Sequence, residues 1–115
     1  MTSEELKNKI VDILNERKVD DMVVLNVSNQ TEIADYMIIL TGKTNTNVKS
    51  LAELVDVKLK QEGIMTLRKD GETEGRWIVL DYGDVLVHIF NKETRGYYQL
   101  EKLWSKEDNS TIIDK

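Results

Sequence analysis

Apolar residues in the first half of the chain follow two different spacings. Near the N-terminus they recur every three or four positions, and Thr2 with Glu5 matches the capping box that begins a helix. Two β-branched runs come next, separated by polar residues typical of a turn. A later helical stripe stops at a glycine, which is common just past a helix end. The pattern predicts a helix over 3–17, strands over 21–27 and 34–42, and a helix from Val48 to Gly63.

The second half is dominated by a hairpin pattern. Two apolar runs within residues 76–90 flank Tyr82 and Gly83, which predicts two strands joined by a tight turn. Ahead of them we expect a strand over 64–68 and a polar loop over 69–75, and after them a helix over 93–104.

The order of these elements, α-β-β-α-β-β-β-α, predicts an α/β fold. We expect a single-domain α-β-α sandwich with a mixed sheet. A chain of 115 residues has room for one core, so residues 1–105 are assigned to one domain and 106–115 to a frayed tail.

Charge narrows the classes of partner. The chain has 16 Lys and Arg against 21 Asp and Glu, a net charge of −5. Binding to RNA or DNA mainly through phosphates requires a basic surface, so we expect no DNA partner and no extensive contact with RNA. A basic protein is the favoured partner. There is no cysteine and no apolar run as long as a membrane span, so the expected location is the cytoplasm, with no membrane partner.

The stretch Gly42-Lys43-Thr44 resembles the end of a phosphate-binding loop. That loop requires a further glycine five positions before Gly42, where this chain has Met37 within a predicted strand. The backbone curl that surrounds a phosphate is therefore not predicted. Instead, Thr44, Asn45 or Thr46 is expected to cap the second helix.

Catalytic and metal-binding patterns are also weak. His88 is the only histidine and lies in a predicted strand, so no pair of histidines can bind zinc. Asp81 and Asp84 could serve as an acid–base or metal pair, but aspartate is common beside tight turns for conformational reasons. We therefore expect no enzyme activity, no cofactor and no metal.

The predicted hairpin has one apolar and one mixed face. With Tyr82 and Gly83 as turn residues, Asp81 faces Asp84 and Trp77 faces His88. Two interpretations of the mixed face are open. A helix could cover Trp77 and leave the aspartates at an edge, or the face could bind a partner, with Trp77 as the anchor and the aspartates as rim charges.

Two blocks of this sequence closely resemble the ribosomal silencing factor family, also called Iojap-like proteins. The resemblance spans about residues 3–104, and Lys43-Thr44 departs from it, because the family more often has small hydroxyl residues there. The matching positions are Ala34-Asp35-Tyr36, Thr41-Gly42, Gly75, Trp77, Leu80 to Val85, His88, Phe90 and Tyr97 to Trp104.

This resemblance implies a fold similar to the nucleotidyltransferases without their catalysis, since the Asp-x-Asp metal pair is missing after Gly42. It also implies binding to ribosomal protein L-fourteen on the large ribosomal subunit, which sterically blocks the small subunit and represses translation when nutrients are short. The expected contact residues are Trp77, His88, Asp35, Asp81 and Asp84, flanked by Tyr82, Tyr97 and Tyr98.

Two alternatives remain at this stage: a residual nucleotide-binding or nucleotidyltransferase enzyme, and a homodimeric scaffold unrelated to ribosomes. Whether the free ribosome-binding protein forms a homodimer is left open.

Overall fold

A single mixed sheet organises the chain. The computed structural model describes residues 1–17, 19–97 and 112–114. Its elements are α1 (Ser3–Asn15), β1 (Asp20–Asn26), β2 (Tyr36–Gly42), α2 (Asn45–Gln61), β3 (Arg68–Asp70), β4 (Trp77–Asp81), β5 (Val85–Asn91), α3 (Lys92–Tyr97) and β6 (Ile112–Asp114). The strands lie in the order β3-β4-β5-β2-β1-β6, with β2 and β5 parallel and the other described pairs antiparallel. The predicted α/β class and mixed sheet are confirmed.

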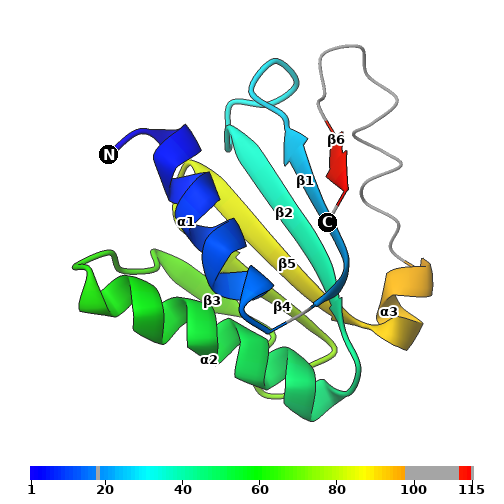
Figure 1. The fold of residues 1–115 in the computed structure, drawn as a ribbon. Helices are drawn as coiled ribbons and strands as arrows, with labels where there is room; N and C mark the ends of the chain where they lie inside the picture. Colours follow the sequence, from blue (N-terminus) through cyan, green and yellow to red (C-terminus); the bar gives the residue numbers. More distant parts are fainter. Residues whose placement is uncertain (18, 98–111, 115) are drawn as a thin grey trace.

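Helices α1 and α2 cover the same face of the sheet (Figure 1). The alternation of side chains along each strand sends every second residue into this layer. Its completely or nearly completely buried members include Ile10, Leu14, Ile38, Leu40, Val55, Leu59, Ile78, Leu80, Val87 and Ile89. A smaller apolar cluster lies on the opposite face, formed by Leu25, Val27, Met37, Ile39 and Phe90. The central strands are therefore buried on both faces.

Helix α3 follows β5 and connects to the sheet through Arg95. Its guanidinium donates to Thr41 Oγ1 at 3.1 Å and to the carbonyl of Asp21 at 3.3 Å. Asp21 has a positive φ of 52° and lies at an irregularity in the β1–β2 pairing, so Arg95 fastens α3 to the bulged part of β1.

The predicted helix caps are confirmed, with Thr44 as the cap among the three candidates, although α1 ends at Asn15 and α2 begins at Asn45. Thr2 Oγ1 accepts from the Glu5 amide and the Glu5 carboxylate accepts from the Thr2 amide, which completes the capping box. Thr44 Oγ1 accepts from the Asn47 amide at 3.0 Å and caps α2. Gly63 follows α2 with a φ of 80°, a conformation that glycine adopts without strain.

Two predicted boundaries need correction, and a third lies partly outside the described residues. The third strand starts at Arg68 instead of residue 64, and it includes Lys69 and Asp70, which the polar pattern had assigned to a loop. Within the predicted frayed tail, residues 112–114 form β6 and pair with β1. Backbone pairing along an available sheet edge orders this segment, although its sequence carries no strong local signal. The described part of the last helix ends at Tyr97, and the rest of its predicted range lies outside the described residues.

No helix in the described ranges has the length and apolar character needed to cross a membrane.

Gly42 allows the close approach of β2 and α2. A Cβ atom at this position would lie 2.6 Å from Val48 Cγ2 and 3.0 Å from the Val48 backbone nitrogen. Val48 is completely buried, so it has little space in which to move away.

Replacing Gly42 by alanine should therefore destabilise the fold by about 1–3 kcal/mol, the usual cost of overpacking a core. Urea unfolding measures the change in the free energy of unfolding. Lys43→Ala, at the exposed neighbouring residue, is the matched control and should change it by less than about 0.5 kcal/mol. Equal stability of Gly42→Ala and the native chain would contradict the packing role.

Candidate functional site

The β4–β5 hairpin turns one residue later than the sequence predicted. The Tyr82 amide donates to the Val85 carbonyl at 3.0 Å, so the two turn residues are Gly83 and Asp84. Gly83 has a φ of 84°, and a glycine first in a two-residue turn suits the twist of a hairpin. The expected pairing of Asp81 with Asp84 is therefore wrong, and Asp81 pairs with Leu86.

Despite this change of register, each side chain of the hairpin lies on the face that the sequence predicted. Trp77 pairs with Phe90 and Val79 pairs with His88, so each residue of β4 meets a partner two positions beyond the expected one. Because side chains alternate with a period of two, a shift of two residues keeps every side chain on its original face.

Trp77, His88 and Phe90 form an aromatic cluster on the sheet face opposite α1 and α2. The Trp77 ring stacks on Phe90 with ring centroids 5.0 Å apart, and the His88 ring lies nearly parallel to Phe90 at 6.2 Å. The Trp77 Nε1–H donates to His88 Nδ1 at 3.0 Å. Trp77 is partly buried, and this cluster fixes the orientation of its indole.

Burial keeps His88 neutral. Its side chain accepts the indole hydrogen bond through Nδ1, which places the imidazole proton on Nε2, and this buried atom has no hydrogen-bond partner in the described part of the chain. Desolvation lowers the pKa of His88 from 6.5 to about 4. At 8% exposure His88 does not supply the expected contact area, because packing of the sheet face encloses it.

Tyr82 also lies in the core, not on a contact surface. It is 8% exposed and belongs to the apolar cluster beneath α1 and α2. Burial, with a smaller contribution from the charge of Asp56, raises the pKa of its phenol. The expected flanking role of Tyr82 is therefore corrected. Tyr97 closes α3, and Tyr98 lies outside the described residues.

The three expected acidic residues gather at one end of the sheet. Amides of Asp35 and Tyr36 donate to the Asp84 carbonyl at 2.8 and 3.1 Å, so the start of β2 lies against the hairpin turn. Asp81 Oδ1 accepts from the Gly83 amide at 2.8 Å and holds the turn from the other side. We name Asp35, Asp81 and Asp84 the acidic turn. The side chain of Asp84 is exposed, and those of Asp35 and Asp81 are partly exposed.

Other charged residues influence Tyr36, which lies next to Asp35 at the acidic-turn end of the sheet. Burial, then the charges of Glu4 and Asp35, raise the pKa of the Tyr36 phenol. Lys7 Nζ lies 5.1 Å from the centre of the same ring, and its charge partly offsets them.

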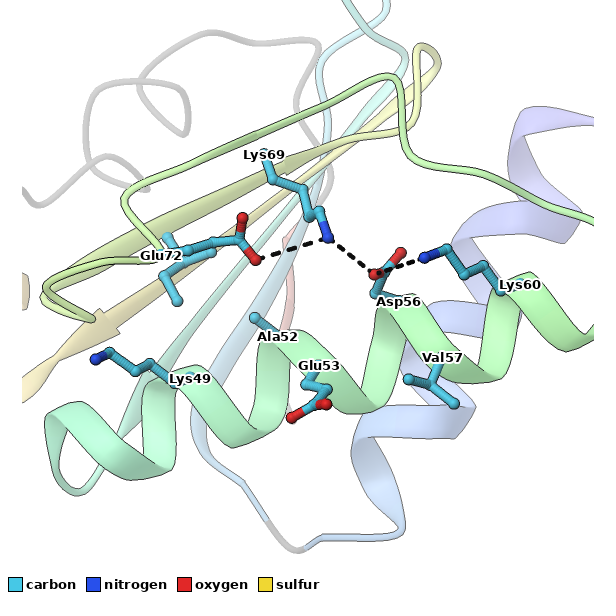
Figure 2. Close-up of a pocket in the computed structure, with 9 residues that line it drawn as sticks. Lys49, Ala52, Glu53, Asp56, Val57, Lys60, Lys69 and Glu72 are labelled. Atoms are coloured by element: carbon cyan, nitrogen blue, oxygen red, sulfur yellow. Dashed lines mark hydrogen bonds and ion pairs between the residues drawn. The ribbon is translucent and has the colours of Figure 1, made fainter.

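A pocket of about 370 Å³ lies between α2 and the β3 strand, well apart from the aromatic cluster on the other sheet face. Its centre is Asp56, whose Oδ2 lies 3.0 Å from Lys69 Nζ and 3.7 Å from Lys60 Nζ. Figure 2 shows Lys69 reaching from β3 between Asp56 and Glu72. The hydrogen bond to Asp56 raises the pKa of Lys69. The other lining residues are Lys49, Ala52, Glu53, Val57 and Ile78.

Sequence patterns did not predict this ion-pair cluster. Asp56 lies one helical turn after Ala52 and so interrupts the buried stripe of α2, which is the signal that could have identified it. The ion pairs of Asp56 with Lys69 and Lys60, together with that of Lys69 with Glu72, balance these charges. Because Lys69 lies on β3 and Asp56 on α2, their ion pair attaches the short β3 strand to α2.

Two amides of the loop after Gly42 are already bonded to side chains. The Lys43 amide donates to Asn47 Oδ1 at 2.9 Å, and the Asn47 amide donates to Thr44. Within the described ranges, no three His, Asp or Glu side chains are arranged to hold a metal ion. The acidic turn, at the other end of β2, is an exposed charged feature of the sheet.

Comparison with known proteins identifies the family. A family model described as "Ribosomal silencing factor during starvation" matches residues 1–115. The chain belongs to this family. The resemblance carried by the hairpin and β2 motifs is confirmed, and with it a ribosome-associated role in silencing translation.

Relatives agree with this membership in sequence and in fold. Ribosomal silencing factor RsfS from Chromobacterium violaceum is 36% identical over 113 residues, covering 98% of this chain and 93% of its own. A crystal structure of a protein from that species has a TM-score of 0.87 at 36% identity, covering 91% of this chain and 88% of that one. A mouse protein named mitochondrial assembly of ribosomal large subunit protein 1 is 28% identical over 102 residues, covering 84% of this chain and 43% of its own length. The likeness to nucleotidyltransferases stays a prediction.

The neutral, buried His88 predicts a specific dependence of stability on pH. Unfolded His88 binds a proton below about pH 6.5, whereas the folded side chain does so only near pH 4, so stability is complete above this window and falls as pH falls through it. Between pH 7 and pH 5 the native chain should lose about 2 kcal/mol more stability than His88→Gln. Urea unfolding at both pH values measures this, and equal losses in the two proteins would show that His88 is not buried in the neutral form.

Proposed function

We propose that this chain binds the large ribosomal subunit through ribosomal protein L-fourteen and prevents the small subunit from joining. Family membership supports a ribosomal role, and the printed name of the mouse relative connects that protein with the large subunit. The observation that carries the proposal is the acidic turn, where backbone hydrogen bonds bring Asp35 beside Asp84 and place acidic residues from two separate segments at one exposed end of the sheet. The place of action is then the cytoplasm.

Charge complementarity supports a basic protein as the direct contact. The chain carries a net charge of −5, and Asp35 and Asp84 lie side by side through the hydrogen bonds of the turn. Lysine or arginine side chains of a partner would relieve the repulsion between these carboxylates and speed the encounter. Ribosomal RNA would be repelled by the same surface, so its contact is peripheral.

The mechanism is obstruction instead of catalysis. A bound protein of 13.3 kDa on the joining face occupies volume that the small subunit needs, so one copy inactivates one large subunit. Trp77 contributes contact area to the bound complex through its partly exposed indole, and His88 and Phe90 hold this ring in place. In this scheme His88 positions Trp77 and does not touch the partner.

A subunit-joining assay tests the function. Purified large and small subunits are mixed with and without the chain and separated on a sucrose gradient. The chain should travel with free large subunits and lower the amount of joined ribosomes in proportion to its concentration. Undiminished joining at saturating chain would overturn the proposal.

Reversal of charge at the acidic turn tests the contact. Asp84→Lys should weaken pelleting with large subunits by roughly tenfold, because it places a cation opposite a basic partner. The side chain of Asp84 is exposed, so the fold should be unaffected. Asp12→Lys, at an exposed position of α1, changes the net charge equally and is the matched control. A similar loss in both variants would indicate a general effect of net charge and would remove the acidic turn from the contact.

A further inference from the structure

Two exposed apolar side chains flank the acidic turn. Ile33 is 75% exposed and Leu67 is 72% exposed, the highest values among the large apolar residues in the described part of the chain. Such side chains are unremarkable when they are scattered singly. These two, however, belong to segments that are both attached to the Gly83–Asp84 turn.

Leu67 adjoins the turn on the β3 side. Its amide donates to the Asp81 carbonyl at 2.7 Å, which extends the pairing of β3 with β4 by one residue. Its Cδ1 is 3.4 Å from the position of a Cβ atom built on Gly83. Leu67 is therefore held beside the turn while most of its side chain faces solvent.

Ile33 adjoins the turn on the β1–β2 side. Its loop returns to the sheet through the Asp35 amide, which donates to the Asp84 carbonyl. Internal hydrogen bonds hold the loop: the Val27 amide donates to the Asp35 carbonyl at 2.8 Å, and the Ile33 amide donates to Thr31 Oγ1 at 3.0 Å. The exposure of Ile33 thus comes from a defined loop, which lowers the entropy lost when a partner covers it.

The charge between these side chains is mainly negative. Asp35, Asp81 and Asp84 make up the acidic turn, and Glu32 precedes Ile33. Arg68 and Lys7 are cations near the acidic turn. Arg68 pairs with Asp81 across β3 and β4, and its Nε lies 3.5 Å from the Asp70 carboxylate. Lys7 Nζ lies 5.1 Å from the centre of the Tyr36 ring. Apolar anchors beside charged groups of one sign are typical of a surface that binds a polypeptide of the opposite sign.

We infer that Leu67 and Ile33 are the apolar anchors of the acidic turn, and that together they bind a basic segment of a protein carrying its own aliphatic side chains. This inference rests on the proposed function and adds two contact residues that neither the hairpin pattern nor the family motifs indicated. The partner segment lies across the turn, with its cations toward Asp35 and Asp84 and its aliphatic groups on Leu67 and Ile33.

Pelleting with purified large ribosomal subunits tests the anchors. Leu67→Ser and Ile33→Ser should each bind about tenfold more weakly than the native chain, because each loses the burial of one aliphatic side chain. Val57→Ser is the matched control, since Val57 is 43% exposed on α2, away from the turn, and its binding should equal that of the native chain.

The outcomes separate this inference from the proposed function. If the native chain fails to pellet with subunits, the proposed function is wrong. If it pellets and both serine variants pellet equally well with unchanged thermal unfolding, the proposed function stands and the anchors are wrong. The native chain should also fail to bind protein-free large-subunit RNA; tight binding there, weakened in the two serine variants, would overturn a polypeptide partner.

Discussion

The parallel pairing of β2 with β5 is the constraint on which the rest of the structure depends. Its register places Tyr36 opposite Val85 at one end and Gly42 opposite Asn91 at the other. The first pair brings Asp35 beside Asp84 and so creates the acidic turn. The second brings the start of α2 beside the start of α3, where Asn91 Nδ2 donates to Asn45 Oδ1 at 2.8 Å. One strand pairing therefore sets both ends of the molecule (Figure 1).

The central position of β2 and β5 in the sheet also explains why polar side chains on these strands are buried. Strands β2 and β5 are covered on both faces, so a polar side chain on them is buried and must either pair or stay neutral. His88 does both, because it accepts from Trp77 and keeps its pKa low. Asp56 is buried on α2 and remains paired with Lys69 and Lys60. These groups restrict the geometry of β4 and β3.

The proposed contact surface follows from the difference between the aromatic cluster and the acidic turn. The aromatic cluster is largely enclosed and gives rigidity, whereas the acidic turn is exposed and carries charge. The sequence suggested a single patch running from Trp77 to the aspartates. Trp77 and Asp81 stand four residues apart on β4, about 13 Å at the usual rise of a strand, so they lie at different ends of the hairpin. The contact proposed for a ribosomal protein therefore centres on the turn, and the indole lies at its margin.

Local patterns in the sequence determined the elements and their faces. The spacing of apolar residues, the capping box at Thr2 and the alternation along residues 76–90 depend only on neighbours in the chain, and each was predicted correctly. The cap of α2 was narrowed to three residues, of which the structure uses Thr44. The motifs also identified the family. Tertiary structure alone decided the ordering of residues 112–114 on β1 and the meeting of Asp35 with Asp84. Both arise from pairing between strands far apart in the sequence, which no short stretch specifies, whereas the hairpin register follows from the turn at Gly83 and Asp84.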